Sequence, residues 1–139
     1  MPTYLAADIA KLEYTDEGAS PTTVDTEFID PSGVTITVNA VRQGVNEGKQ
    51  VTAYKEVEVE LTLFDRGTTK SSLATIEQTD EEITWTITLL DGTTIETAKA
   101  APISIEDNVE QAEGLLPYTV LSTYHVDRSE DAYSETAPA

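Results

Sequence analysis

Apolar and polar residues alternate along two segments of the chain, Val34–Val41 and Val51–Phe64. Alternation with a period of two, rich in β-branched residues, is typical of a strand with one face in a core and the other in water. The apolar face of the first segment comprises Val34, Ile36, Val38 and Ala40. In the second segment Val57, Val59, Leu61 and Leu63 alternate with Glu56, Glu58, Glu60 and Thr62. Both segments are predicted to be half-buried strands.

A hairpin is predicted in the second half of the chain. Apolar residues alternate with threonine from Ile83 to Leu89, and Asp91-Gly92 separates this run from Thr93–Ala98. Asp-Gly between two strands favours a type I′ turn, because that turn needs positive φ at both central residues. Trp85 belongs to the apolar face of the first strand and is expected in the core.

Three further strands complete the expected set. Pro102 interrupts the next apolar run, so Ile103–Asp107 is expected to be a short or edge strand. Tyr118–Val126 alternates over its whole length and predicts a long last strand. Near the start of the chain, Asp8–Tyr14 is a candidate edge strand.

One short helix is predicted over Thr69–Gln78, where Leu73 and Ile76 form an apolar stripe and Thr68 or Thr69 can cap the first turn. Because one small helix is not stable alone, it is expected to dock on the sheet. The Asp30-Pro31-Ser32-Gly33 sequence predicts a type I turn before the first strand.

The expected fold is therefore mainly β, an antiparallel β-sandwich or small barrel with one short flanking α-helix. Residues 1–126 are predicted to form a single domain. Residues 127–139 carry four acids and one arginine without apolar periodicity, which predicts an acidic, disordered C-terminal tail. Residues 16–21 are expected to be a second mobile segment. The polar segment Arg42–Gln50 is predicted to be a loop longer than a hairpin requires.

Composition adds a strong charge constraint. The chain of 139 residues has 26 acidic and 8 basic residues, a net charge of -18, and no cysteine. This charge opposes tight binding to nucleic acid or to anionic membranes. Disulfides, thiol catalysis and cysteine-zinc sites are excluded. No apolar run is long enough to span a bilayer and the N-terminus lacks the features of a secretory signal, so a soluble protein made in the cytoplasm is expected.

No group of residues indicates catalysis. His125 lies in a strand and is more simply a structural residue than a general base. The alternating acids Glu56, Glu58 and Glu60 resemble a solvated face more than a glycosidase pair. Glu106–Asp107–Asn108 and Asp80–Glu81–Glu82 are acidic enough for weak calcium binding, but hydrophilic turns explain them better. We expect no enzyme activity, no cofactor and no metal.

The order of elements nevertheless resembles a known family. A strand, a long polar loop, the strand E-V-E-V-E-L-T-L, one short helix, the W-T-I-T-L-L-D-G-T hairpin and a closing strand after G-L-L-P-Y follow one another over residues 8–126. This order is similar to that of the tail-tube proteins of long-tailed bacteriophages and archaeal tailed viruses, which are related to the tube protein of type VI secretion. The resemblance is one of architecture, because the family has no signature residues to match.

The resemblance implies a structural virion protein of the viral tail, made in the host cytoplasm. Its subunits would form hexameric rings that stack into a tube, meet the tape measure, terminator and tip proteins, and conduct DNA without binding it. By position, the inter-subunit loop would comprise Arg42, Gln43, Gly44, Val45, Asn46, Glu47, Gly48, Lys49 and Gln50. The lumen face would comprise Glu56, Glu58 and Glu60.

One departure and two alternatives accompany this hypothesis. The charge of -18 is extreme for a subunit of a closed ring, and it suggests a salty environment such as a halophilic source. Another virion β-sandwich, such as a head–tail completion, terminator or decoration protein, is the first alternative. A small ligand- or calcium-binding sandwich is the second.

Overall fold

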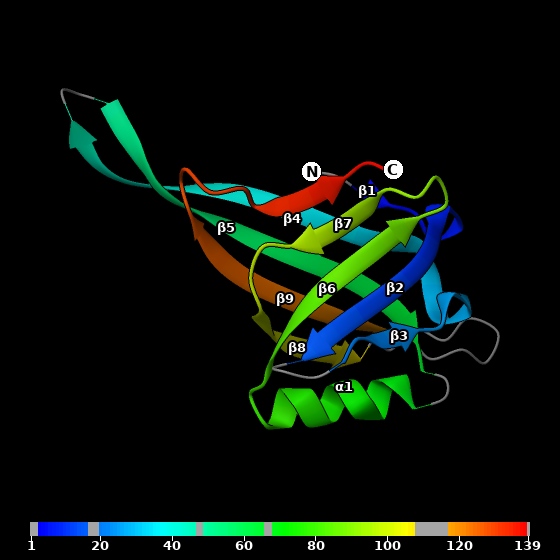
Figure 1. Ribbon diagram of the computed structural model, residues 1–139. Coiled ribbons are helices and arrows are strands. Elements are labelled where there is room, and N and C mark those ends of the chain that lie inside the picture. The colour runs from blue at the N-terminus through cyan, green and yellow to red at the C-terminus, as the bar shows by residue number, and fades with distance from the viewer. Residues whose placement is uncertain (1–2, 17–19, 47–48, 66–67, 108–116, 139) are drawn as a thin grey trace.

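The computed structural model describes residues 3–16, 20–46, 49–65, 68–107 and 117–138 (Figure 1). Of residues 42–46 and 49–53 it describes the backbone alone. The ten strands among them are β1 (Thr3–Tyr4), β2 (Ile9–Asp16), β3 (Thr22–Val24), β4 (Ile29–Asn46), β5 (Lys49–Phe64), β6 (Glu82–Leu89), β7 (Thr94–Thr97), β8 (Ala101–Asp107), β9 (Pro117–Asp127) and β10 (Tyr133–Thr136). The helices are α1 (Thr69–Gln78) and two 3₁₀ turns, η1 (Ala6–Asp8) and η2 (Thr26–Phe28). The expected mainly antiparallel β fold with one short helix is confirmed.

The strands form one sheet that curls around the core, in the order β1-β4-β5-β9-β8-β6-β2-β3, with β7 beside β6 and β10 beside β7. Strand β8 is the corner: Ala101 and Pro102 pair with β6, whereas Ile103–Asp107 pairs with β9. The curl brings β6 and β2 in front of β5 and β9 in Figure 1, while α1 lies below them. All pairs are antiparallel.

The core follows the period-two pattern of the strands. Strands β5 and β9 pair without interruption from Tyr54↔Asp127 to Phe64↔Pro117, so their apolar residues share one face. Side chains from β2, β6 and β7 cover that face from the opposite side of the curl. The largest fully buried side chains are Trp85, Tyr118, Leu12, Ile36, Leu61, Leu63, Leu73, Ile83, Ile87, Ile95, Val24 and Val34. Val38, expected in the core, is 38% exposed because β4 leaves the body there.

The Asp30-Pro31-Ser32-Gly33 turn lies inside β4 as an irregularity of the strand, not before it. The register with β5 shifts between Ile29 and Val34, and the Asp30 carboxylate accepts hydrogen bonds from Ser32 N–H and Oγ at 3.0 and 2.7 Å. Gly33 has φ +72°, and a Cβ there would lie 1.9 Å from the Tyr4 carbonyl oxygen. The glycine therefore lets β1 approach the bulged strand.

Helix α1 has the predicted bounds, and both Leu73 and Ile76 are buried. The expected threonine cap is absent: Thr68 occupies the N-cap position, but its side chain makes no capping hydrogen bond. The backbone carbonyl of Thr68 instead accepts a hydrogen bond from Ser71 Oγ at 3.0 Å.

The β6–β7 hairpin is confirmed, but its turn is not type I′. Leu89 pairs with Thr93 around a three-residue loop, Leu89 O accepts from Gly92 N–H at 3.0 Å, and only Gly92 in this loop has positive φ. This geometry is a type I turn followed by a glycine in the left-handed region. The prediction of a two-residue turn was wrong because Asp91 uses its carboxylate to accept the Thr93 N–H at 2.8 Å.

The C-terminal segment is not disordered throughout, contrary to expectation. Tyr133–Thr136 forms β10, which pairs with Thr94–Thr97 of β7. The Tyr124 hydroxyl donates a hydrogen bond to the Ala132 carbonyl, and Tyr133 packs against the core. The free edge of β7 gives this polar segment a partner that its own sequence does not reveal.

At the other end of the sheet, β2 is longer than expected and is flanked by β6 and by β3. It is therefore not the last strand of the sheet. Of the segment expected to be mobile, residues 16–21, positions 17–19 lie outside the described residues.

Trp85 connects the two opposed parts of the curled sheet, β6 and β2 on one side and β9 on the other. Its ring is 1% exposed, its Nε1 donates to Ser122 Oγ of β9 at 2.8 Å, and its edge meets Tyr14 at 5.7 Å between ring centroids. We predict that Trp85→Ala lowers the free energy of unfolding by about 3–5 kcal/mol, measured by urea denaturation. Ser122→Ala, which keeps the packing but leaves the indole N–H unpaired, should cost about 1–3 kcal/mol. A loss below ~1 kcal/mol for Trp85→Ala would contradict this arrangement of the core.

Tyr118 is a second buried aromatic residue, and its hydroxyl has no hydrogen-bond partner among the residues described. Burial raises the pKa of Tyr118 and raises the pKa of Tyr4 to about 12. Both groups are held neutral in the fold, so their contribution to stability is complete below pH 10 and is lost as pH rises through the folded pKa values. We predict that Tyr118→Phe stabilises the protein by about 1 kcal/mol near pH 7 and weakens the loss of stability above pH 10. Destabilisation of this variant near pH 7 would show that the hydroxyl has a partner.

Candidate functional site

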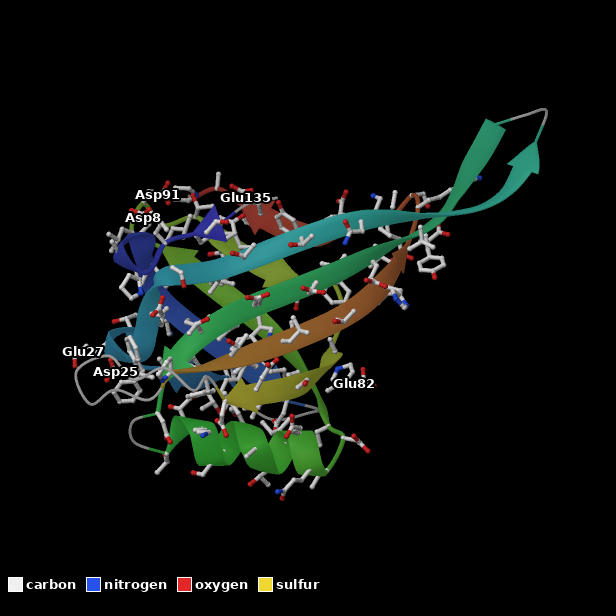
Figure 2. The ribbon with its side chains drawn as sticks, turned by 180° about the vertical axis from the view of Figure 1, so that it is seen from behind. Asp8, Asp25, Glu27, Glu82, Asp91 and Glu135 are labelled. Atoms are coloured by element: carbon white, nitrogen blue, oxygen red, sulfur yellow. The ribbon has the colours of Figure 1, made fainter. Side chains whose placement is uncertain are left out.

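The face of β4, β5, β9 and β8 that points away from the core forms one polar surface, here called the carboxylate face (Figure 2). The strand registers place its residues in rows across the sheet. One row is Asn39–Glu56–His125, the next is Thr37–Glu58–Thr123, and the third is Thr35–Glu60–Leu121–Ser104. A fourth row is Thr62–Thr119–Glu106. The surface thus consists mainly of carboxylates and threonines, together with Asn39, Ser104, His125 and the apolar Leu121.

The expected stripe of Glu56, Glu58 and Glu60 lies on this face, alternating with the buried Val57, Val59 and Leu61 of β5. That this stripe of glutamates faces a lumen stays a prediction. The structure adds Glu106, which sequence reasoning did not group with the stripe because β8 reaches it only through β9. Recognising that neighbour requires the strand order, which the sequence does not give.

No lysine or arginine lies on the described part of this face. Lys55, the neighbour of Glu56 in β5, lies on the other side of the sheet, where its Nζ donates to the Glu130 carbonyl at 2.8 Å. The nearest cationic candidate is His125, whose Nε2 lies 3.4 Å from Glu56 Oε2 and whose ring lies 5.0 Å from that of Tyr54. The described part of the face therefore has acceptors for cations but no lysine or arginine to neutralise the charge of phosphates.

The acids of this face do not converge on a metal site. A shallow hollow of about 210 Å³ is lined by Glu60, Ser104, Glu106, Thr119 and Leu121. Asp107, suspected as a calcium ligand beside Glu106, instead lies 2.6 Å from Lys70 Nζ, and Asn108 lies outside the described residues. Within the described ranges no group of three histidine or acidic side chains is arranged to hold a metal ion.

The segment Arg42–Gln50 was expected to be a loop, but its described part continues the two strands. Strand β4 runs to Asn46 and β5 begins at Lys49, with pairs such as Gln43↔Val51 and Asn46↔Lys49. Glu47 and Gly48 lie outside the described residues. Its glycines and polar residues predicted a loop. A strand that lies outside the core needs no alternation of apolar and polar residues, so the sequence pattern could not indicate it.

This hairpin projects beyond the body (Figure 1). Strand β9 reaches only to Tyr54, and β1 pairs only with Val34 and Thr35, so beyond those points β4 and β5 have only each other as partners among the described strands. We call residues 41–54 the arm. An isolated two-stranded ribbon is at best marginally stable in water, and the described strands of the arm continue a pair that is anchored in the body.

The four-stranded wall β4-β5-β9-β8 has one open and one covered edge. Beyond Thr35, no described strand pairs with the outer edge of β4. At the other edge, Glu77 Oε2 of α1 accepts the Ile105 N–H of β8 at 2.5 Å, and Lys70 of α1 pairs with Asp107. An open edge strand invites pairing with another chain, whereas a side chain on the edge opposes it.

Comparisons with known proteins do not add a family to this geometry. No helix in the described part of the chain is both long and apolar enough to cross a membrane. No protein-family model, curated protein or solved structure matches the chain.

Proposed function

We propose that the protein is a structural subunit of a viral tail tube, which forms hexameric rings that stack around a DNA-conducting lumen. The observation that carries this proposal is the carboxylate face, a broad sheet surface with four glutamates and no described lysine or arginine. The affinity of proteins for DNA comes largely from basic side chains that neutralise phosphates, and a wall of carboxylates repels the DNA backbone. Such a wall lets DNA slide along it without being held.

The edges of the wall support assembly from several copies. The open edge of β4 leaves backbone N–H and C=O groups without a strand partner, and closing a ring removes such edges. At the β8 edge, the Ile105 N–H is held by Glu77. If β8 of one copy pairs with β4 of the next, the Ile105 N–H must therefore give up its hydrogen bond to the Glu77 carboxylate and donate to a backbone carbonyl of the neighbouring copy.

In this role the protein has no catalytic activity. It acts in the virion tail with itself, the tape measure, the terminator and the tip proteins, and without any cofactor. The charge of -18 makes ring closure costly at low salt, which favours a salty environment such as that of a halophilic host. A head–tail completion protein with the same fold would form rings that never stack.

Self-assembly is the first test. We predict that concentrated protein forms rings and stacked tubes, seen by electron microscopy and sedimentation, and that raising salt to about 1 M promotes them because it screens repulsion between copies. Monomers that persist at every salt and protein concentration would contradict a tube. Rings without stacks would favour a completion protein.

The second test addresses the carboxylate face. Changing Glu56, Glu58 and Glu60 to lysine adds two charges at each of three sites and moves the net charge from -18 to -12. We predict that this variant still assembles, binds double-stranded DNA increasingly as salt falls, and slows DNA passage in particles. The control variant carries Glu27→Lys, Glu82→Lys and Glu96→Lys and has the same net charge. Equal DNA binding by both variants, measured by fluorescence anisotropy, would show that net charge and not this face controls the contact.

A further inference from the structure

The outer edge of β8 consists of the backbone groups that point away from β9. In an antiparallel pair, alternate residues direct both their N–H and their C=O toward the partner strand or away from it. Ile105 lies opposite Val120 of β9, yet its N–H donates to Glu77 of α1, so this residue belongs to the outward set together with Ile103 and Asp107. Among the described strands, none pairs with this edge beyond Pro102. Helix α1 runs beside it in both views (Figures 1 and 2).

Two side chains of α1 contact this edge. Lys70 and Glu77 lie seven residues apart, about two helical turns, and reach β8 at Asp107 and Ile105 respectively. The Asp107 side chain is 72% exposed, so its ion pair with Lys70 is screened by water and contributes little. The contact of Glu77 is stronger, because a carboxylate accepts the Ile105 N–H at 2.5 Å in a partly buried position.

The position of Glu77 is fixed by the packing of its helix. Leu73 and Ile76 of α1 are buried in the core, and Ile76 is the residue before Glu77. A strand of another chain can pair with β8 only in the space beside this edge, where α1 lies. The free subunit therefore has one uncovered edge, that of β4 beyond Thr35, and one edge that α1 covers.

We propose that the hydrogen bond between Glu77 and the Ile105 N–H is an autoinhibitory contact that controls assembly. It keeps the β8 edge covered in the free subunit, and the edge pairs with another copy only after Glu77 releases the amide and α1 moves aside. The Ile105 N–H has an acceptor in both states, so the main cost of pairing is the displacement of α1 from its site. The inference rests on the proposed function and assigns the regulation of its ring contact.

Amide hydrogen exchange tests the contact in separated subunits at low salt, where acidic copies repel one another. Glu77→Ala should accelerate exchange of the Ile105 N–H about tenfold or more, the loss expected for a hydrogen bond to a charged acceptor. Alanine favours helix, so α1 should remain formed. Glu77→Gln, which keeps an acceptor oxygen, should have a smaller effect. The N–H groups of Ser104 and Glu106 face β9 and serve as internal controls, since their exchange should not change. Unchanged exchange at Ile105 in Glu77→Ala would overturn the proposal, whether or not tubes form.

Assembly of the full-length protein tests the regulatory role. Glu77→Ala should lower the protein concentration needed for ring formation about tenfold, measured by sedimentation and electron microscopy, while Glu77→Gln should resemble the unaltered protein. Glu96→Ala removes the same charge from an exposed position on β7 and is the matched control. If rings form but Glu77→Ala needs the same concentration as Glu96→Ala, the autoinhibitory role is overturned while the tube stands. If no variant associates at any salt or protein concentration, the tube proposal fails and the regulatory role fails with it.

Discussion

The uninterrupted pairing of β5 with β9 is the constraint on which the rest of the structure depends. Eleven successive residue pairs, from Tyr54↔Asp127 to Phe64↔Pro117, fix which side chains of both strands point inward. A slip of one residue in either strand would turn its valines and leucines toward water and its polar residues into the core. The same register therefore produces both the apolar wall that Trp85 covers and the carboxylate face on the opposite side.

Sequence patterns predicted the parts of the fold whose local signal agrees with their burial. Helix α1 and strands β5, β6 and β9 follow from the spacing of apolar residues, because each buries one complete face or stripe. Strands β1, β3 and β10 have two to four residues and exist only because a neighbour offers a free edge. The acidic C-terminal segment was expected to be disordered for this reason, because its own sequence does not show the free edge with which it pairs. The Asp91-Gly92 turn differs from its predicted type for another reason. Its prediction considered only the φ angles of the two residues and not a hydrogen bond from the backbone to the Asp91 carboxylate.

The candidate site was predictable only in part. The glutamates of β5 could be placed on one face from their spacing alone, but the addition of Glu106 and the absence of lysine and arginine from the described rows beside them depend on strand order. The arm was expected as a loop, because a ribbon outside the core is under no selection for a buried face.

Accessibility of the carboxylate face in assembled particles tests the central claim most directly. The chain has no cysteine, so Glu58→Cys and Glu82→Cys each introduce a single reactive thiol, one on this face and one elsewhere. If the face lines a lumen, a bulky maleimide conjugate that is too large to enter a tube will label Cys at position 58 before assembly but not after it, while labelling at position 82 persists and a small maleimide still reaches both. Equal labelling of position 58 by the bulky reagent before and after assembly would contradict a lumen lined by this face.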